Sequence, residues 1–170
     1  YCSSGGVLTN CLIYGLNSAT FGGGVYLIDG GELYNCTIAG NYASDSGGGI
    51  VCSNGGTIIN TIIYDNQAVG GSHNWRNYAS GAAFSFCCTT PTNGLPVGND
   101  CILDSPEFVD TIPPDLDYRL EEISPCIDVG VNMPWTVAPG ATDLDGNPRI
   151  YAYTQYRVDM GCYEFIPEPG

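Results

Sequence analysis

Three consecutive segments decide the fold of this chain: GGVLTNCLIYGLNSATFGGGVYLID (5–29), GGELYNCTIAGNYASDSGGGIVCSN (30–54) and GGTIINTIIYDNQAVGGSHNWRNYA (55–79). They align without gaps, so the sequence repeats every 25 residues. Short apolar runs alternate with Gly, Asn and Ser turns, a pattern typical of one coil of a parallel β-helix and unlike a leucine-rich repeat. The sequence therefore predicts an all-β, right-handed parallel β-helix of 25-residue coils.

The aligned columns predict which side chains stack. Coils of a β-helix lie ~4.8 Å apart, so equivalent residues sit above one another. The column Asn10, Asn35 and Asn60 suits a tight corner, because Asn tolerates left-handed backbone and its amide can bond the next Asn. The glycine columns likewise indicate corners with positive φ. We expect these side chains to point inward: Leu8, Cys11, Ile13, Val25, Leu27, Leu33, Cys36, Ile38, Ile50, Cys52, Ile58, Thr61, Ile63 and Trp75.

Nine cysteines favour an oxidising, extracellular setting. The chain has no C-x-x-C pair and a single histidine, which argues against zinc. Cys11 and Cys36 stack in one column, but parallel side chains hold their Cβ atoms wider than the ~3.8 Å of a disulfide. We expect both to be buried and mostly reduced. We also expect Cys101 to pair with Cys87 or Cys88, closing a short loop.

The charge balance limits the partners. Eighteen acidic residues against four arginines give a net charge of −14, which disfavours nucleic acid and anionic membranes. The apolar runs fall short of the ~18 residues that span a membrane.

The period loosens after the third repeat. Ala82–Cys88 resembles a fourth strand, and an irregular Pro-rich sequence follows. Because the end of a solenoid exposes backbone and core, it needs covering. We therefore assign 1–89 to β-helix coils, 90–166 to a C-terminal cap of the same domain, and 167–170 to the start of a tail.

Five motifs follow one another in the cap: SPEFVD (105–110), DYRL (117–120), SPCIDVG (124–130), DLDGNPRI (143–150) and VDMGCYEF (158–165). Their order and spacing resemble the C-terminal module of bacterial surface β-helix proteins of the choice-of-anchor Q domain family. The Gly-Gly-Gly coils also resemble those of this family and of polymorphic outer-membrane protein repeats, and FIPEPG (165–170) resembles the start of a PEP-CTERM sorting signal. The resemblance implies export and attachment to the bacterial cell surface, without an established catalytic activity. A bond between Cys126 and Cys162 stays open, because the family pattern does not imply it.

The motif DLDGN (143–147) alternates oxygen-bearing side chains before a glycine. Asp143, Asp145 and Asn147 are thus candidate calcium ligands, although an Asx turn is the favoured interpretation because the EF-hand spacing is absent. Asp128 and Asp159 could pair for glycoside hydrolysis, but turn roles are favoured. The sequon at Asn35 is more simply a member of the Asn column. Four tyrosines could stack sugars, with ladder packing as the simpler interpretation: Tyr14, Tyr26, Tyr42 and Tyr64.

Together these features favour a structural or adhesive extracellular module over an enzyme. The alternative is a fragment of a carbohydrate-active β-helix lyase or hydrolase, which would need charged residues stacked on one face. No cofactor is expected apart from the calcium alternative. The expected partners are surface glycans, and either further coils of the same protein upstream or a second copy that joins head to tail at the first coil and builds a filament.

Overall fold

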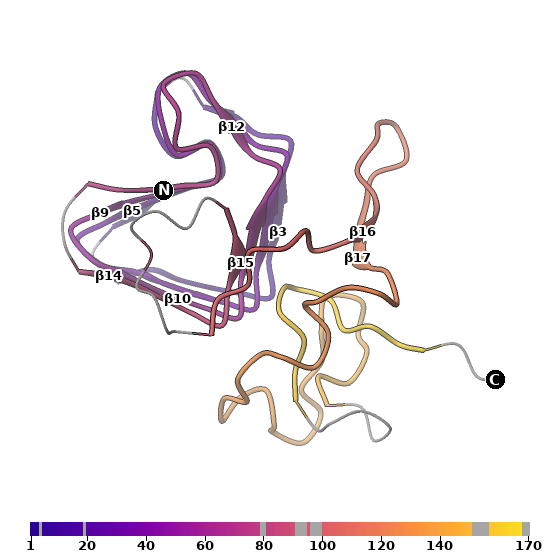
Figure 1. Ribbon diagram of the computed structural model, residues 1–170. Coiled ribbons are helices and arrows are strands. Elements are labelled where there is room, and N and C mark those ends of the chain that lie inside the picture. The colour runs from indigo at the N-terminus through magenta and orange to yellow at the C-terminus, as the bar shows by residue number, and fades with distance from the viewer. Residues whose placement is uncertain are drawn as a thin grey trace.

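The computed structural model describes residues 1–3, 5–18, 20–78, 81–90, 95, 100–150 and 157–167. Within these ranges the chain is all-β, and Figure 1 looks along the axis of its stacked coils. The parallel β-helix predicted from the repeat is confirmed. No described helix has the length and apolarity that crossing a bilayer requires.

The described coils form four parallel sheets, each built from one strand per coil. The first contains β1 (Cys2–Ser3), β5 (Val25–Ile28), β9 (Ile50–Ser53) and β13 (Trp75–Asn77). The second contains β2 (Val7–Thr9), β6 (Glu32–Tyr34), β10 (Gly56–Ile59) and β14 (Ala82–Ser85). The third contains β3 (Leu12–Tyr14), β7 (Thr37–Ala39), β11 (Ile62–Tyr64) and β15 (Cys88–Thr89). The fourth contains β4 (Asn17–Ser18), β8 (Tyr42–Ala43) and β12 (Gln67–Ala68).

Strand register follows the sequence repeat. Leu8 pairs with Leu33, and Leu33 pairs with Ile58, as the 25-residue period requires. The fourth coil, expected from the apolar run after Gly81, continues the register with Ile58 opposite Phe84, which takes one extra residue. The expected inward residues of the second and third coils are buried, as are Val25 and Leu27 of the first coil. Leu8, Cys11 and Ile13 of the first coil are partly exposed at the edge of the stack.

The corners use the residues that the columns predicted. Asn10, Asn35 and Asn60 have φ values of 54°, 46° and 52°, so each occupies the left-handed region. The Gly triplets serve two purposes. Gly47 has a φ of 66°, whereas a Cβ on Gly49 would lie 2.7 Å from Nδ2 of Asn66, so here close packing excludes a side chain.

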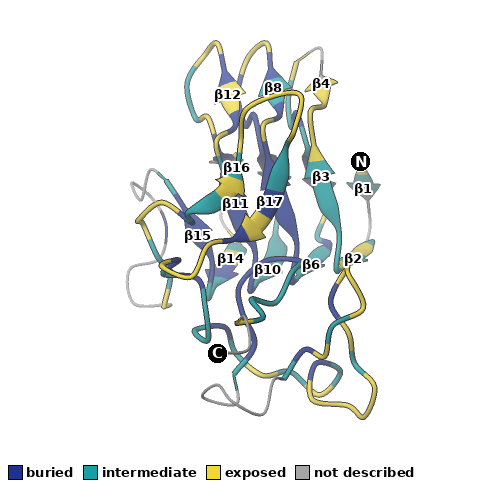
Figure 2. Ribbon diagram, turned by 90° about the vertical axis from the view of Figure 1, so that its right-hand side faces the viewer, coloured by how far each residue is buried: buried dark blue, intermediate teal, exposed yellow. Residues whose placement is uncertain are grey.

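The C-terminal region lies elsewhere than expected. Instead of capping the end of the stack, residues 104–150 and 157–167 run alongside it, over the third sheet and the Asn corner (Figures 1 and 2). This region includes the antiparallel hairpin of β16 (Phe108–Asp110) and β17 (Asp117–Leu120). Hydrogen bonds from the Asn column connect this region to each of the first three coils. The prediction of an end cap over 90–166 is therefore wrong for most of that range.

The end of the stack is covered by fewer residues. Leu95 is buried in the solenoid core, and Cys101 packs against that core. Ile102 bridges Cys88 in parallel, with its N–H donating to the carbonyl of Cys87 at 2.7 Å. Most of the Pro-rich segment 91–99 and residues 168–170 of the predicted tail lie outside the described residues.

Candidate binding cleft

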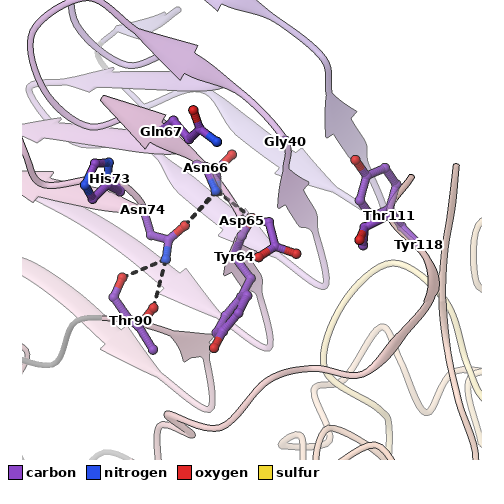
Figure 3. A pocket seen from close by; sticks show the side chains of 10 residues that line it. All are labelled: Gly40, Tyr64, Asp65, Asn66, Gln67, His73, Asn74, Thr90, Thr111 and Tyr118. Atoms are coloured by element: carbon purple, nitrogen blue, oxygen red, sulfur yellow. Dashed lines mark hydrogen bonds between the residues drawn. The ribbon is translucent and has the colours of Figure 1, made fainter. Parts of the chain in front are cut away.

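A cleft of about 720 Å³ opens where the coils turn from the third sheet to the fourth. The hairpin β16–β17 forms the opposite wall. Figure 3 shows Thr111 and Tyr118 of this hairpin across the cleft from the coil residues. The coils contribute Gly40, Tyr64, Asp65, Asn66, Gln67, His73, Asn74 and Thr90.

A buried ladder of asparagines forms the floor of the cleft. Oδ1 of Asn66 accepts hydrogen bonds from the backbone N and the Nδ2 of Asn41, both at 3.0 Å. Nδ2 of Asn66 donates to the carbonyl of Ile38 at 2.8 Å. Oδ1 of Asn74 in turn accepts from the backbone N of Asn66 at 3.0 Å, and its Nδ2 donates to the carbonyl of Thr90 at 2.7 Å. The ladder thus satisfies backbone groups at a corner where strand pairing is interrupted. Sequence analysis missed it, although the 25-residue spacing of Asn41 and Asn66 could have indicated it.

An aromatic cluster places the hairpin wall. The ring of Tyr118 lies 5.6 Å from that of Tyr14 and 5.2 Å from that of Phe108, measured between centroids. Such tilted and edge-to-face contacts stabilise aromatic pairs beyond simple burial. Gly40 leaves room for the hydroxyl of Tyr118, because a Cβ there would lie 2.8 Å from it. The hairpin is therefore held against the coils through the buried Tyr118, which packs on the half-exposed Tyr14.

The coil wall presents one acid and one tyrosine. Asp65 has a φ of 55° and remains exposed at the surface of the cleft. Protein atoms around its carboxylate still displace part of the solvent, and this desolvation raises its pKa. Burial also raises the pKa of Tyr64. Nδ1 of His73 accepts from the backbone N of Ala68 at 3.0 Å, so the proton of the neutral ring is on Nε2.

These side chains suit binding better than acid–base chemistry. Among the lining residues that the structure describes, the cleft combines two tyrosines, amide and hydroxyl groups, and a single carboxylate, that of Asp65. A mixture of aromatic faces and fixed polar groups is what sites for small polar ligands commonly contain. In the described part of the chain, no three His, Cys, Asp or Glu side chains gather as a metal site would need.

The predicted motif 143–147 forms a turn. Oδ1 of Asp143 accepts hydrogen bonds from the backbone N of Asp145 at 2.9 Å and from that of Asn147 at 2.7 Å, which is an Asx turn. Asp145 instead binds Arg119 through both carboxylate oxygens, at 2.7 and 2.9 Å. The three candidate ligands do not converge, so the structure lends no support to calcium binding there.

Asp128 and Asp159 do come together, but as structural groups. Oδ1 of Asp159 accepts from the backbone N of Asp128 at 2.7 Å, and Oδ2 accepts from that of Phe165 at 2.6 Å. Asp159 is 2% exposed, so both oxygens are removed from solvent. Nearby, the fully buried Arg149 pairs with Glu164 at 2.7 Å. Burial raises the pKa of Asp159 to about 7 and that of Glu164 to about 8.

The Asn column binds the C-terminal region. Nδ2 of Asn60 donates to Oδ1 of Asn35 at 3.2 Å, so the predicted bond between coils exists there. The same side chains also hold the C-terminal region through five hydrogen-bonding contacts, made by Asn10 with Thr142 and Arg149, by Asn35 with Asp159, and by Asn60 with both backbone groups of Val131. Sequence periodicity could not indicate this second role, because the partners lie outside the repeat. Asn35 is fully buried, which explains why its sequon is a structural feature.

None of the nine cysteines forms a disulfide in this structure, so the predicted bond of Cys101 with Cys87 or Cys88 is not present, and neither is the Cys126–Cys162 bond that the sequence left open. Cys36 is buried as expected, but Cys11 is only half-buried because it lies in the first coil. Cys101 contacts Cys87, whereas Cys88 contacts Cys126. Of the tyrosines considered as sugar platforms, Tyr64 lines the cleft and Tyr14 packs beside it, while Tyr26 contacts Tyr1.

Comparison with known proteins adds no relative. No family model matches the chain, and no curated protein or solved structure matches it. The resemblance to the choice-of-anchor Q family therefore rests on the cap motifs and the Gly-Gly-Gly coils of the sequence.

Proposed function

We propose that this chain is a structural and adhesive module of an extracellular, bacterial cell-surface protein, and that it acts without catalysis. The observation that carries the proposal is the way the chain is braced. Strand ladders and two asparagine ladders run along the stack, and the C-terminal region binds three coils at once. Such an arrangement makes a stiff body that presents a fixed surface.

The cleft between the coils and the hairpin is the proposed adhesive site. Its volume of about 720 Å³ falls in the range of small-molecule sites, which is about 300–1,000 Å³. A net charge of −14 and the carboxylate of Asp65 disfavour anionic polysaccharides. The ligand class that fits is therefore a neutral oligosaccharide, with Tyr64 as the face on which a sugar ring packs.

A panel of neutral and anionic oligosaccharides tests this proposal by titration calorimetry. We expect binding of a neutral glycan that Tyr64→Ala and Gln67→Ala both weaken. Gln67 is exposed, so its loss should leave folding intact and separates a binding defect from an unfolded protein. Tyr26→Ala, far from the cleft on the first sheet, is the matched control. Equal binding by all variants, or no binding across the panel, contradicts the cleft as the adhesive site.

The alternative of a carbohydrate-active enzyme is tested on the same panel extended with pectins, alginate and glycosaminoglycans. We expect no product release. Release that Asp65→Asn abolishes would establish an enzyme acting in the cleft. Release lost only on replacing Asp128 or Asp159 would place catalysis in the C-terminal region instead.

The first coil supports the proposed self-association or extension. β2 and β3 lie at the edges of their sheets, so one side of each carries backbone groups that pair with no described strand. Leu8 and Ile13 of this coil are partly exposed, whereas the equivalent Leu33 and Ile38 of the second coil are fully buried. Such an edge is a template for another strand. We propose that it pairs with a further 25-residue coil, from a longer polypeptide or from a second copy. Light scattering across protein concentrations tests the second copy, which predicts growth into head-to-tail oligomers.

A further inference from the structure

Six of the nine cysteines meet in three thiol pairs, all within the described residues. Cys11 contacts Cys36, Cys87 contacts Cys101, and Cys88 contacts Cys126. The other three cysteines are Cys2, Cys52 and Cys162. The pairs differ in how the backbone holds them, and that difference decides which of them can become a disulfide.

The first two pairs are stacked in register between parallel coils. Leu12 pairs with Thr37, which places Cys11 beside Cys36 one residue earlier. The bridge between Cys88 and Ile102 places Cys87 beside Cys101 in the same way. Parallel neighbours are about 4.8 Å apart with side chains pointing the same way, which is wide for the ~3.8 Å between Cβ atoms of a disulfide.

These stacked thiols already have a role as donors. The Sγ atom of Cys36 contacts the carbonyl oxygen of Tyr34 at 3.3 Å, and that of Cys87 contacts the carbonyl oxygen of Ser85 at 3.3 Å. In the third coil the hydroxyl of Thr61 makes the same contact with Ile59 at 2.9 Å. Because a threonine can replace a cysteine in this column, the column needs a donor at the corner and not a disulfide.

The third pair, Cys88 and Cys126, is not stacked in register between parallel coils. Side chains alternate along a strand, so Cys87 points into the solenoid core while Cys88 points outward. There Cys88 meets Cys126 of the C-terminal region, and both thiols are fully buried in one apolar cluster with Ile62 and Met160. Cys126 lies outside the described strands, so no ladder sets the direction of its Cβ.

We propose that Cys88 and Cys126 form a disulfide under oxidising conditions, which fastens the C-terminal region covalently to the fourth coil. The oxidant is a small-molecule disulfide such as oxidised glutathione. One thiolate attacks the oxidant and releases one glutathione thiol, and the second thiolate then attacks the mixed disulfide and releases the other. The two cysteines lose two electrons to the oxidant, and their two protons end on the two glutathione thiols or in solvent.

The burial of this pair determines when the bond forms. Contact with Cys126 and burial raise the pKa of Cys88 well above its usual value, so the folded protein offers little thiolate. Oxidation therefore takes place before the C-terminal region docks, or when it opens locally. Once formed, the bond closes a loop of about 40 residues, which favours the docked state by on the order of 100- to 1,000-fold.

The test is to refold the full chain in a glutathione redox buffer, block free thiols, and map linked peptides by mass spectrometry. We expect a Cys88–Cys126 link, with Cys11, Cys36 and Cys101 alkylated without reduction. Because Cys87 adjoins Cys88, the assignment uses two variants: Cys87→Ser should keep the link and Cys126→Ser should lose it. A Cys87–Cys101 link, or a natively folded oxidised protein with Cys126 alkylated, overturns the proposal.

A second measurement keeps the proposal testable if Cys126→Ser folds poorly. Limited proteolysis of the wild-type chain compares the oxidised and reduced forms. We expect cleavage within the C-terminal region to slow by at least 10-fold on oxidation, and Cys101→Ala to behave like wild type. Equal cleavage rates for a protein shown to carry the link would mean that the bond does not fasten this region.

Discussion

Asn66→Ala is the most informative substitution in the coils, because the side chain of Asn66 joins several buried polar groups. Asn66 is 4% exposed. Its Oδ1 accepts from the backbone N of Asn41, and its Nδ2 donates to the carbonyls of Ile38 and Tyr64. Alanine leaves at least two of these groups buried without a partner. Each such loss costs about 1–3 kcal/mol, so we expect the free energy of unfolding to fall by about 4 kcal/mol.

The assay is urea unfolding followed by circular dichroism, with the free energy extrapolated to zero denaturant. Asn17→Ala is the matched control, because Asn17 is an exposed asparagine in β4 of the fourth sheet, whose strand β12 begins directly after Asn66, and we expect a change within about 0.5 kcal/mol. A loss below about 1 kcal/mol for Asn66→Ala would refute the reasoning. It would mean that water or a backbone shift satisfies the ladder equally well.

Three further predictions concern the C-terminal region and the coils. Burial raises the pKa of Asp159 to about 7 and that of Glu164 to about 8, so each carboxyl binds its proton more tightly in the folded state than in the unfolded state. The resulting stabilisation is fully present below about pH 4, the ordinary pKa of these groups, and it is lost as the pH rises through their folded-state pKa values. Urea unfolding should give a lower free energy of unfolding at about pH 9 than at about pH 5, and Asp159→Asn should make this difference smaller. The same pH dependence in wild type and variant would exclude the Asp159 carboxyl as its cause. Gly49→Ala should destabilise the protein by about 1–3 kcal/mol, because its Cβ would lie 2.7 Å from Nδ2 of Asn66; a melting temperature equal to wild type would show that the coils can separate locally. Calcium or a chelator should leave the melting temperature unchanged, since the turn 143–147 is closed by its own hydrogen bonds. A shift in melting temperature would show that this motif binds the metal.

For the five C-terminal motifs, the sequence predicted local turn structure correctly but did not predict where the region lies on the coils. The motif DLDGN was best interpreted as an Asx turn, and the backbone bonds of Asp143 confirm it, because such a turn depends on residues two to four positions away. The placement of most of the region 90–166 as an end cap was wrong. Its position depends on contacts over more than 100 residues, such as that of Asn10 with Thr142, and no local pattern encodes them.

The candidate cleft falls between these two cases. The coil wall comes from one corner of the repeat, so Tyr64 and Asn66 stand in columns that a sequence can reveal. The hairpin wall is positioned by Tyr118, which packs on Phe108 within the hairpin and on Tyr14 of β3, more than 100 residues away in the sequence. The cysteines follow the same division: stacking of Cys11 on Cys36 was predictable, and the meeting of Cys88 with Cys126 was not.

What the sequence determined by itself was the solenoid: its 25-residue period, the register of its strands, its inward side chains and its left-handed Asn corners. A parallel stack makes this possible, because each residue contacts its equivalent one period away. The alignment of the repeats therefore gives the contact partners between coils. Only the tertiary structure decided that the C-terminal region lies along the Asn column, that a cleft opens beneath the hairpin, and that Cys88 faces Cys126. Those contacts join residues that share no period, and their partners are selected by shape, burial and hydrogen bonding in the folded chain.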